Sequence, residues 1–275
     1  YFTNTRGKAL STGWFGLSTA EFLMPVTIIY ALTIMDWRNI WIIISVSIIL
    51  FLPLVSYFLV KEVKLSSRED DNEVAKENIK QWKRSEVIKD YRFIIIALNM
   101  LAMPWIATGI FVYQSFILSA KNWGEYTIAQ SFMVYSIASV LTLFVAGYLI
   151  DKFTSRKLLI YMNIPFLISL LILIYFQSPV SSFFFLGLIG VSNGFANVLG
   201  SSTWAELYGV KFIGSIKALT TALMVFSTAF GTAFFGLMID FDFSIEQISM
   251  ISGGYILISL ILLFLIKNKL NPTIL

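Results

Sequence analysis

Two residue types, cysteine and histidine, are missing from the 275-residue sequence. Without cysteine the chain forms no disulfide bond and carries no thiol nucleophile. Without histidine it lacks the commonest general base and the commonest metal ligand. The sequence also contains no glycine-rich phosphate loop, no metal-ligand cluster and no catalytic triad. We therefore expect no enzyme, no cofactor and no bound metal.

Charge is scarce as well. Charged residues make up 13% of the chain and hydrophobic residues 57%, which is far too apolar for a soluble domain of this length. The formal net charge is +4, but the basic residues are spread over the loops between apolar runs and form no single patch. This distribution excludes a nucleic-acid partner and indicates a lipid bilayer as the surroundings.

Long apolar runs dominate what is present. A helix needs about 20 residues to cross the ~30 Å hydrocarbon core, and backbone groups in lipid must bond within the helix. The sequence therefore predicts an all-α integral membrane protein with eight transmembrane helices. The runs lie near residues 9–34, 39–60, 93–118, 127–150, 158–177, 182–205, 215–239 and 247–266.

The basic residues predict the orientation of these spans. Threading the chain back and forth places all of the 20 Lys and Arg residues except Arg38 and Lys121 on one side. Cytoplasmic loops carry an excess of Lys and Arg. We therefore expect a multi-pass protein of the cell (inner or plasma) membrane, with residues 1–8, the loop 61–92 and the C-terminus in the cytoplasm.

The polar segment 61–92 divides the chain into two spans within residues 1–60 and six spans within residues 93–275. An internal repeat relates the first two spans to the last two: TRGKAL at 5–10 corresponds to IGSIKAL at 213–219. Such repeats are typical of transporters built from two six-span halves. On this interpretation the first four spans are absent, residues 61–92 are a cytoplasmic linker, and the 275 residues alone do not transport.

One short loop carries a recognisable motif. Residues 147–157 read GYLIDKFTSRK, close to the pattern G-x-L-x-D-[RK]-x-G-R-[RK], with Thr154 and Ser155 in place of the pattern's Gly and first Arg. This stretch resembles the cytoplasmic loop of the major facilitator superfamily. TRGKAL is similar to the loop before that family's fifth helix, and Asp36-Trp37-Arg38 to its external turn before the sixth.

The resemblance implies a secondary active transporter that moves a small-molecule substrate by alternating access, with protons as the driver and a monomer as the full-length form. The subgroup of organic-anion or monocarboxylate porters is the most similar. The alternative is a membrane sensor or assembly protein that has the transporter fold but does not transport.

Four polar residues inside the spans are candidate substrate contacts. Tyr113 and Gln114 lie in the third span, and Gln114 is predicted to share a helix face with Asn99, from which it is close to four turns away. Asn193 and Asn197 lie in the sixth span, which the resemblance places beside the central cavity. The alternative role for all four is hydrogen bonding between helices.

Two small residues, Gly190 and Gly200, share the asparagine stripe of the sixth span. Glycines in membrane helices allow close helix packing or a hinge. We expect close packing at this stripe.

Glu21 lies in the middle of the first span, where a charge is costly, so it is expected to face protein or a water-filled cavity. Its functional role would be proton coupling. The alternative is a neutral, hydrogen-bonded side chain that holds two helices together.

Gly147, Asp151, Lys152 and Arg156 are predicted to gate the cytoplasmic side. Gly147 lets a neighbouring helix approach, and Asp151 is expected to face the positive N-terminal end of the seventh span. The basic residues are expected to pair with carboxylates such as Glu206. The alternative role for the basic residues is to set topology alone.

Overall fold

The computed structural model describes residues 19–20, 23–24, 27–28, 30–62 and 80–273. Every regular element in this part of the chain is a helix. The chain forms two units. Of the described residues, 23–62 belong to the smaller unit, and 19–20 and 80–273 belong to the larger one. Each unit is described by itself below.

Seven helical segments in the described residues are long and apolar enough to cross a membrane, which confirms the all-α membrane class. The first expected span, 9–34, lies largely outside the described residues. The seven segments are Trp37–Tyr57, Tyr91–Val112, Tyr126–Phe153, Ser155–Tyr175, Ser181–Tyr208, Ile213–Asp240 and Ile245–Lys269.

The smaller unit is represented mainly by one helix, α2 (Trp37–Glu62), which contains Pro53. Asp36 precedes it and accepts a hydrogen bond from the backbone N–H of Trp37 at 2.9 Å. Ile40 is buried, while most of the helix's other described side chains are exposed within this unit. An apolar helix of this kind requires lipid or protein around it.

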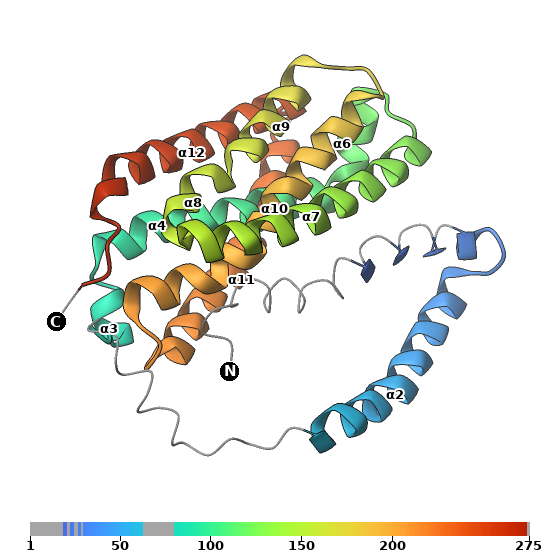
Figure 1. The fold of residues 1–275 in the computed structure, drawn as a ribbon. Coiled ribbons are helices and arrows are strands. Elements are labelled where there is room, and N and C mark those ends of the chain that lie inside the picture. Colours follow the sequence, from blue (N-terminus) through green and yellow to red (C-terminus); the bar gives the residue numbers. More distant parts are fainter. Residues whose placement is uncertain (1–18, 21–22, 25–26, 29, 63–79, 274–275) are drawn as a thin grey trace. The chain divides into compact units, whose positions relative to one another are not determined.

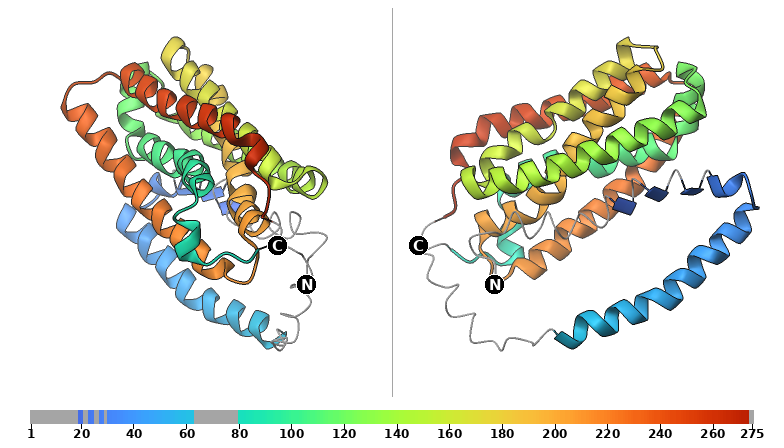
Figure 2. Two further views of the ribbon diagram at one scale, coloured as in Figure 1. Left: turned by 90° about the vertical axis from the view of Figure 1, so that its left-hand side faces the viewer. Right: turned by 45° about the vertical axis from the view of Figure 1, so that its right-hand side comes forward.

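The larger unit is a bundle in which α4 to α12 run side by side (Figures 1 and 2). Its first spanning segment is interrupted. It runs through α4 (Tyr91–Ala102), the π-helix η3 (Met103–Ala107), α5 (Thr108–Val112) and α6 (Gln114–Lys121). Pro104 lies in η3 and has no backbone N–H to donate, which explains the wider turn there. A second break follows at Tyr113, with φ −100° and ψ 26°.

The next spanning segments alternate in direction. They are α7 (Glu125–Phe153), the pair α8 (Ser155–Met162) and α9 (Ile164–Tyr175), then α10 (Ser181–Tyr208), α11 (Ile213–Asp240) and α12 (Ile245–Ile266). The α8–α9 break falls at Asn163, two residues before Pro165. The backbone N–H of Gln247 bonds to the Ser244 side chain, which caps the start of α12.

Helices α7 and α10 make the most extensive contact in the bundle. A Cβ added at Gly190 of α10 would collide with the carbonyl oxygen of Tyr135 on α7. Gly231 of α11 likewise lies against the carbonyl oxygen of Trp105 in η3. Small residues let these backbones approach, as expected between membrane helices. The predicted packing role of Gly190 is confirmed.

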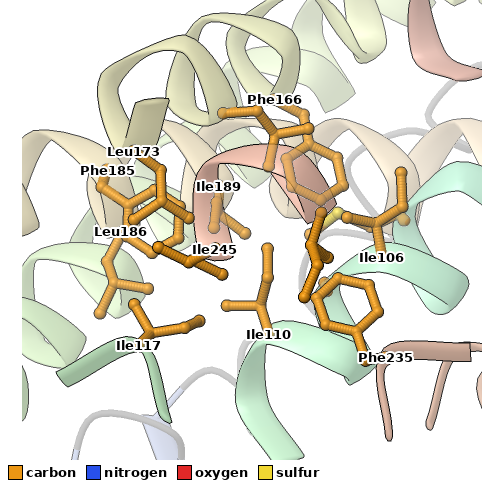
Figure 3. Close-up of a cluster of buried hydrophobic side chains, with 14 of the residues drawn as sticks. Ile106, Ile110, Ile117, Phe166, Leu173, Phe185, Leu186, Ile189, Phe235 and Ile245 are labelled. Atoms are coloured by element: carbon orange, nitrogen blue, oxygen red, sulfur yellow. The ribbon is translucent and has the colours of Figure 1, made fainter. Parts of the chain in front are cut away.

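Apolar side chains from all six spanning segments of the larger unit fill the core. Figure 3 shows Ile110 of α5 between Phe235 of α11 and side chains of α10 and α12. A second buried cluster, which contains Trp204 and Tyr208, lies where α4, α8 and the ends of α10 and α12 meet. These clusters fix the positions of the polar residues described below.

The bundle has two distinct ends. The basic end, as we call it, holds the short helix α3 (Arg84–Val87) and the end of α12 (Figure 1), the start of α8 and the end of α10. The opposite end holds residues 122–124, 176–180 and 241–244. Contacts between Arg156 and Asn271 and between Gln81 and Lys211 join the basic segments. Their predicted clustering on one side is confirmed for residues 80–273.

Candidate substrate cavity

A cavity of about 310 Å³ opens into the larger unit beside η3. Its walls come from α4, η3, α5, α10 and α11, with Tyr135 of α7 and Met162 of α8. Asn193 and Asn197 lie near the middle of α10, and Thr108 lies near the middle of the first spanning segment. The cavity therefore spans the middle of the bundle and extends toward the basic end, where Trp204 and Thr220 also line it.

Two features of the sequence create this space. Pro104 widens the helical turn at η3, and Pro104, Ala107 and Thr108 all line the cavity. Gly200 lines the facing wall on α10, where an added Cβ would meet no atom within 4 Å. The predicted packing role of Gly200 is therefore wrong: its missing side chain leaves the cavity open instead of bringing a neighbouring helix closer.

The two asparagines of α10 that line the cavity differ in their hydrogen bonding. The Asn193 side-chain nitrogen donates a hydrogen bond to the Ser139 hydroxyl of α7 at 3.1 Å, which fixes its orientation. Within the described residues, no group hydrogen-bonds the amide of Asn197. Asn197 therefore presents both a donor and an acceptor to whatever fills the cavity.

Tyr113 and Gln114, the other two predicted substrate contacts, lie elsewhere. The Tyr113 hydroxyl packs against Gly236 of α11. Gln114 is exposed and borders a small separate recess of about 10 Å³. Neither residue lines the cavity beside η3, and their contact with substrate stays a prediction.

The expectation that Asn99 and Gln114 share a helix face is wrong. Asn99 is fully buried, and its amide nitrogen donates to the Ser259 hydroxyl of α12 at 3.2 Å. The π-helical turn of η3 and the break at Tyr113 rotate α6 relative to α4. An unbroken helical period therefore does not apply between these positions.

The rest of the lining is apolar. Four methionines supply much of it, a contribution that the sequence analysis missed, and none of the lining residues is charged. Met side chains are flexible and polarizable, so they adapt to irregular ligands. Pro104 within an apolar span is a sequence signal for the distorted turn beside these side chains. The methionines are Met100, Met103, Met162 and Met224.

The basic end holds the predicted gating residues. Gly147 is buried in α7, while Asp151 and Lys152 are exposed at its end. Arg156 Nε lies 3.0 Å from Glu206 Oε1, so the expected pairing with Glu206 is present. Glu206 also accepts hydrogen bonds from the backbone and hydroxyl of Ser155. The gating role of these residues stays a prediction.

Thr154 is one of the two departures from the loop motif. It stands where the pattern has glycine, and its φ is 83° with ψ 145°. This region of backbone space favours glycine and is strained for a β-branched residue. Thr154 therefore keeps the sharp turn between α7 and α8 that the pattern's glycine would form without strain.

A second polar cluster ties α4 to the C-terminal segment. Asp90 accepts a hydrogen bond from the Arg92 backbone N–H at 2.9 Å, and the Arg92 guanidinium lies 2.8 Å from its carboxylate. The Tyr208 hydroxyl also donates to Asp90, at 3.2 Å. Arg92 in turn donates to the carbonyl of Asn271 at 2.8 Å. This cluster joins the start of α4, the end of α10 and the residues after α12.

Glu86 of α3 lies beside this cluster. Its carboxylate accepts a hydrogen bond from the Lys83 backbone N–H at 2.8 Å, and the Lys80 ammonium is 2.9 Å away. The backbone hydrogen bond from Lys83, followed by the Lys80 contact, lowers the pKa of Glu86 below its usual 4.5.

Different contacts hold the helix ends together at the opposite end of the bundle. The Lys121 side chain is fully buried, and its ammonium lies 2.7 Å from Glu246, whose side chain is 31% exposed. Trp123 is also buried and donates from its ring nitrogen to the Gln177 carbonyl at 2.9 Å. Glu21, the predicted proton-coupling residue, lies outside the described residues.

Comparison with known proteins gives one finding. The family model described as Major Facilitator Superfamily matches residues 1–232 and, separately, 94–274. Together the two matches cover nearly the whole chain. No curated protein matches the chain.

Proposed function

Since the chain belongs to the Major Facilitator Superfamily, a family of membrane transporters, we propose that it is a secondary active transporter. It moves a small uncharged solute with apolar and hydrogen-bonding parts. The solute binds midway along the bundle, and access alternates between the two membrane faces. The solute and the bilayer are its partners, and it works as a monomer.

The observation that carries this proposal is the cavity beside η3. It spans the middle of the bundle, where transporters of this architecture bind their substrates. Apolar walls with a few placed polar groups are typical of small-molecule sites. The unpaired amide of Asn197 and the oriented amide of Asn193 supply those groups.

The residues that line the cavity favour a solute without net charge. A carboxylate substrate requires a cation or several donors, because burying an unpaired charge is costly. The residues that line this cavity include no Lys or Arg. An organic anion would therefore need a cation from another part of the protein, so an uncharged solute suits this wall better.

Coupling and gating complete the proposal. A proton gradient drives transport, with Glu21 as the coupling acid. The basic end faces the cytoplasm, in accord with its excess of Lys and Arg. Asp151, Lys152 and Arg156 hold this end closed in one of the alternating states, and the Arg156–Glu206 ion pair supports such a role.

The test is uptake into proteoliposomes of the full-length protein, using labelled uncharged solutes and labelled carboxylates, with and without a protonophore. We expect an uncharged solute to accumulate and the protonophore to abolish accumulation. Gly200→Val places a side chain in the cavity and should lower uptake about tenfold, since misfit contacts cost about 1–3 kcal/mol.

Gly254→Val is the matched control. Gly254 lies in the middle of α12, does not line the cavity, and an added Cβ there also meets no atom within 4 Å. Uptake by this variant should equal that of the unmodified protein. Equal losses in both variants, or uptake of carboxylates alone, would contradict the proposal.

A further inference from the structure

A second and larger cavity, of about 680 Å³, lies at the basic end. It is bordered by the end of α7, by α8 and by the residues that follow α12. Helix α8 packs beside both α7 and α12 (Figure 1). We call this space the basic groove. None of its lining residues takes part in the cavity beside η3.

All the charged residues that line the basic groove are cationic: Arg156, Lys157 and Lys267. Arg156 is already neutralised by Glu206, and it also donates to Leu270 and Asn271. Lys157 and Lys267 are exposed, and within the described residues neither forms an ion pair. Among the residues that the structure describes, therefore, no carboxylate pairs with two of the groove's positive charges.

The remaining walls are largely apolar. Phe153 is 43% exposed and Tyr161 58% exposed, and both line the groove with Leu149 and Ile160. These side chains belong to membrane-spanning segments, so their exposed surface is available to an apolar ligand. The Lys267 ammonium lies 3.7 Å from the centre of the Phe264 ring, at the boundary between aromatic and charged surface.

We propose that the basic groove binds an anionic phospholipid, with the headgroup phosphate between Lys157 and Lys267 and an acyl chain along Phe153 and Tyr161. Basic spaces between membrane helices suit anionic headgroups. A free phosphate would use the lysines but leave the apolar wall uncovered, so a lipid fits the groove better. The N-terminal end of α8 is not the phosphate site, because Glu206 already accepts its first backbone N–H.

The test measures lipid affinity of the full-length protein in detergent by native mass spectrometry, with dioleoylphosphatidylglycerol as the probe. Each lysine near a phosphate is worth about a fivefold change in affinity. The Lys157→Gln/Lys267→Gln double variant should therefore bind this lipid about 25-fold more weakly. Binding of dioleoylphosphatidylcholine should differ little between the variant and the unmodified protein.

The matched control is Lys211→Gln/Lys217→Gln. Both lysines are exposed and lie around the start of α11, at the basic end, outside the groove. Lys211 also lies over an aromatic ring, that of Phe212, as Lys267 does over Phe264. Affinity for the anionic lipid should change less than twofold in this control.

Two outcomes would overturn the proposal. Equal losses in the two double variants would mean that lipid responds to overall surface charge and not to the groove. Glycerol 3-phosphate or inorganic phosphate that displaces the lipid at similar concentrations would assign the lysines to a free anion. Thermal unfolding of each variant, measured without added lipid, checks that the exposed substitutions leave the fold intact.

Discussion

The two ends of the six-span bundle are held together in different ways. At the basic end, the Arg156–Glu206 ion pair and several hydrogen bonds to backbone carbonyls, including that of Arg92 to Asn271, connect segments far apart in sequence. At the opposite end, one ion pair with a fully buried lysine connects α6 to α12. Contacts spread over several partners can separate one at a time, whereas the fully buried Lys121 charge depends on the Glu246 carboxylate.

The sharpest test of this difference is Glu246→Gln. It leaves the Lys121 ammonium buried without a counter-ion and should lower the free energy of unfolding by about 3–5 kcal/mol. Lys121→Met removes the buried charge, and the partly exposed Glu246 remains in contact with water, so the loss should be smaller. Denaturant unfolding in mild detergent measures both.

The double variant Lys121→Met/Glu246→Gln serves as the control for this pair. It should be about as stable as Lys121→Met alone, because neither protein contains an unpaired buried charge. If Glu246→Gln proved no less stable than Lys121→Met, the opposite end would not depend on this ion pair, and the proposed contrast between the ends would be wrong.

At the basic end, Arg156→Gln should cost less, about 2 kcal/mol, the range of a hydrogen bond to a charged group. Arg156 contacts Glu206, Leu270 and Asn271, but neighbouring links such as that of Arg92 to Asn271 remain. Lys152→Gln, at the exposed end of α7, should change stability by less than about 0.5 kcal/mol. Equal effects at the two positions would contradict a specific role for the Arg156 contacts.

Much of this architecture could be predicted from sequence because hydropathy identifies the segments that lie in lipid, and the placement of Lys and Arg identifies the loops that lie on one side of the membrane. The spans and the clustering of basic loops follow from such patterns, and helical spacing places Asn193 and Asn197 on one face, whereas the family resemblance implied that this face lines a cavity. Each depends on local composition or on which residues share one unbroken helix, as α10 shows.

The remaining features depend on packing that no local pattern specifies. Pro104 signals a distortion, but not the π-helical turn that rotates α6 and moves Gln114 away from the face of Asn99. The sequence placed Lys121 only on the side opposite most Lys and Arg residues, and its burial results from the fold of α6 against α12. The same periodicity argument that placed Asn197 therefore failed for Gln114.

The smallest expected effect concerns Glu86 at the basic end. The Lys83 backbone N–H and the Lys80 ammonium lower its pKa, so its contacts stabilise the folded segment above pH 4.5. This contribution should be lost as the pH falls through the lowered pKa, because the carboxylate then takes up a proton. Amide hydrogen exchange at Val87, corrected for intrinsic rates, should show protection that declines below pH 4.5 in the unmodified protein.

In Glu86→Gln the same protection should be lower at neutral pH and should not vary across this range, because the amide does not titrate. Protection at Ile248 of α12, which lies at the opposite end, should be the same in both proteins. If the acid-dependent decline persisted in Glu86→Gln, another carboxylate would hold α3 in place.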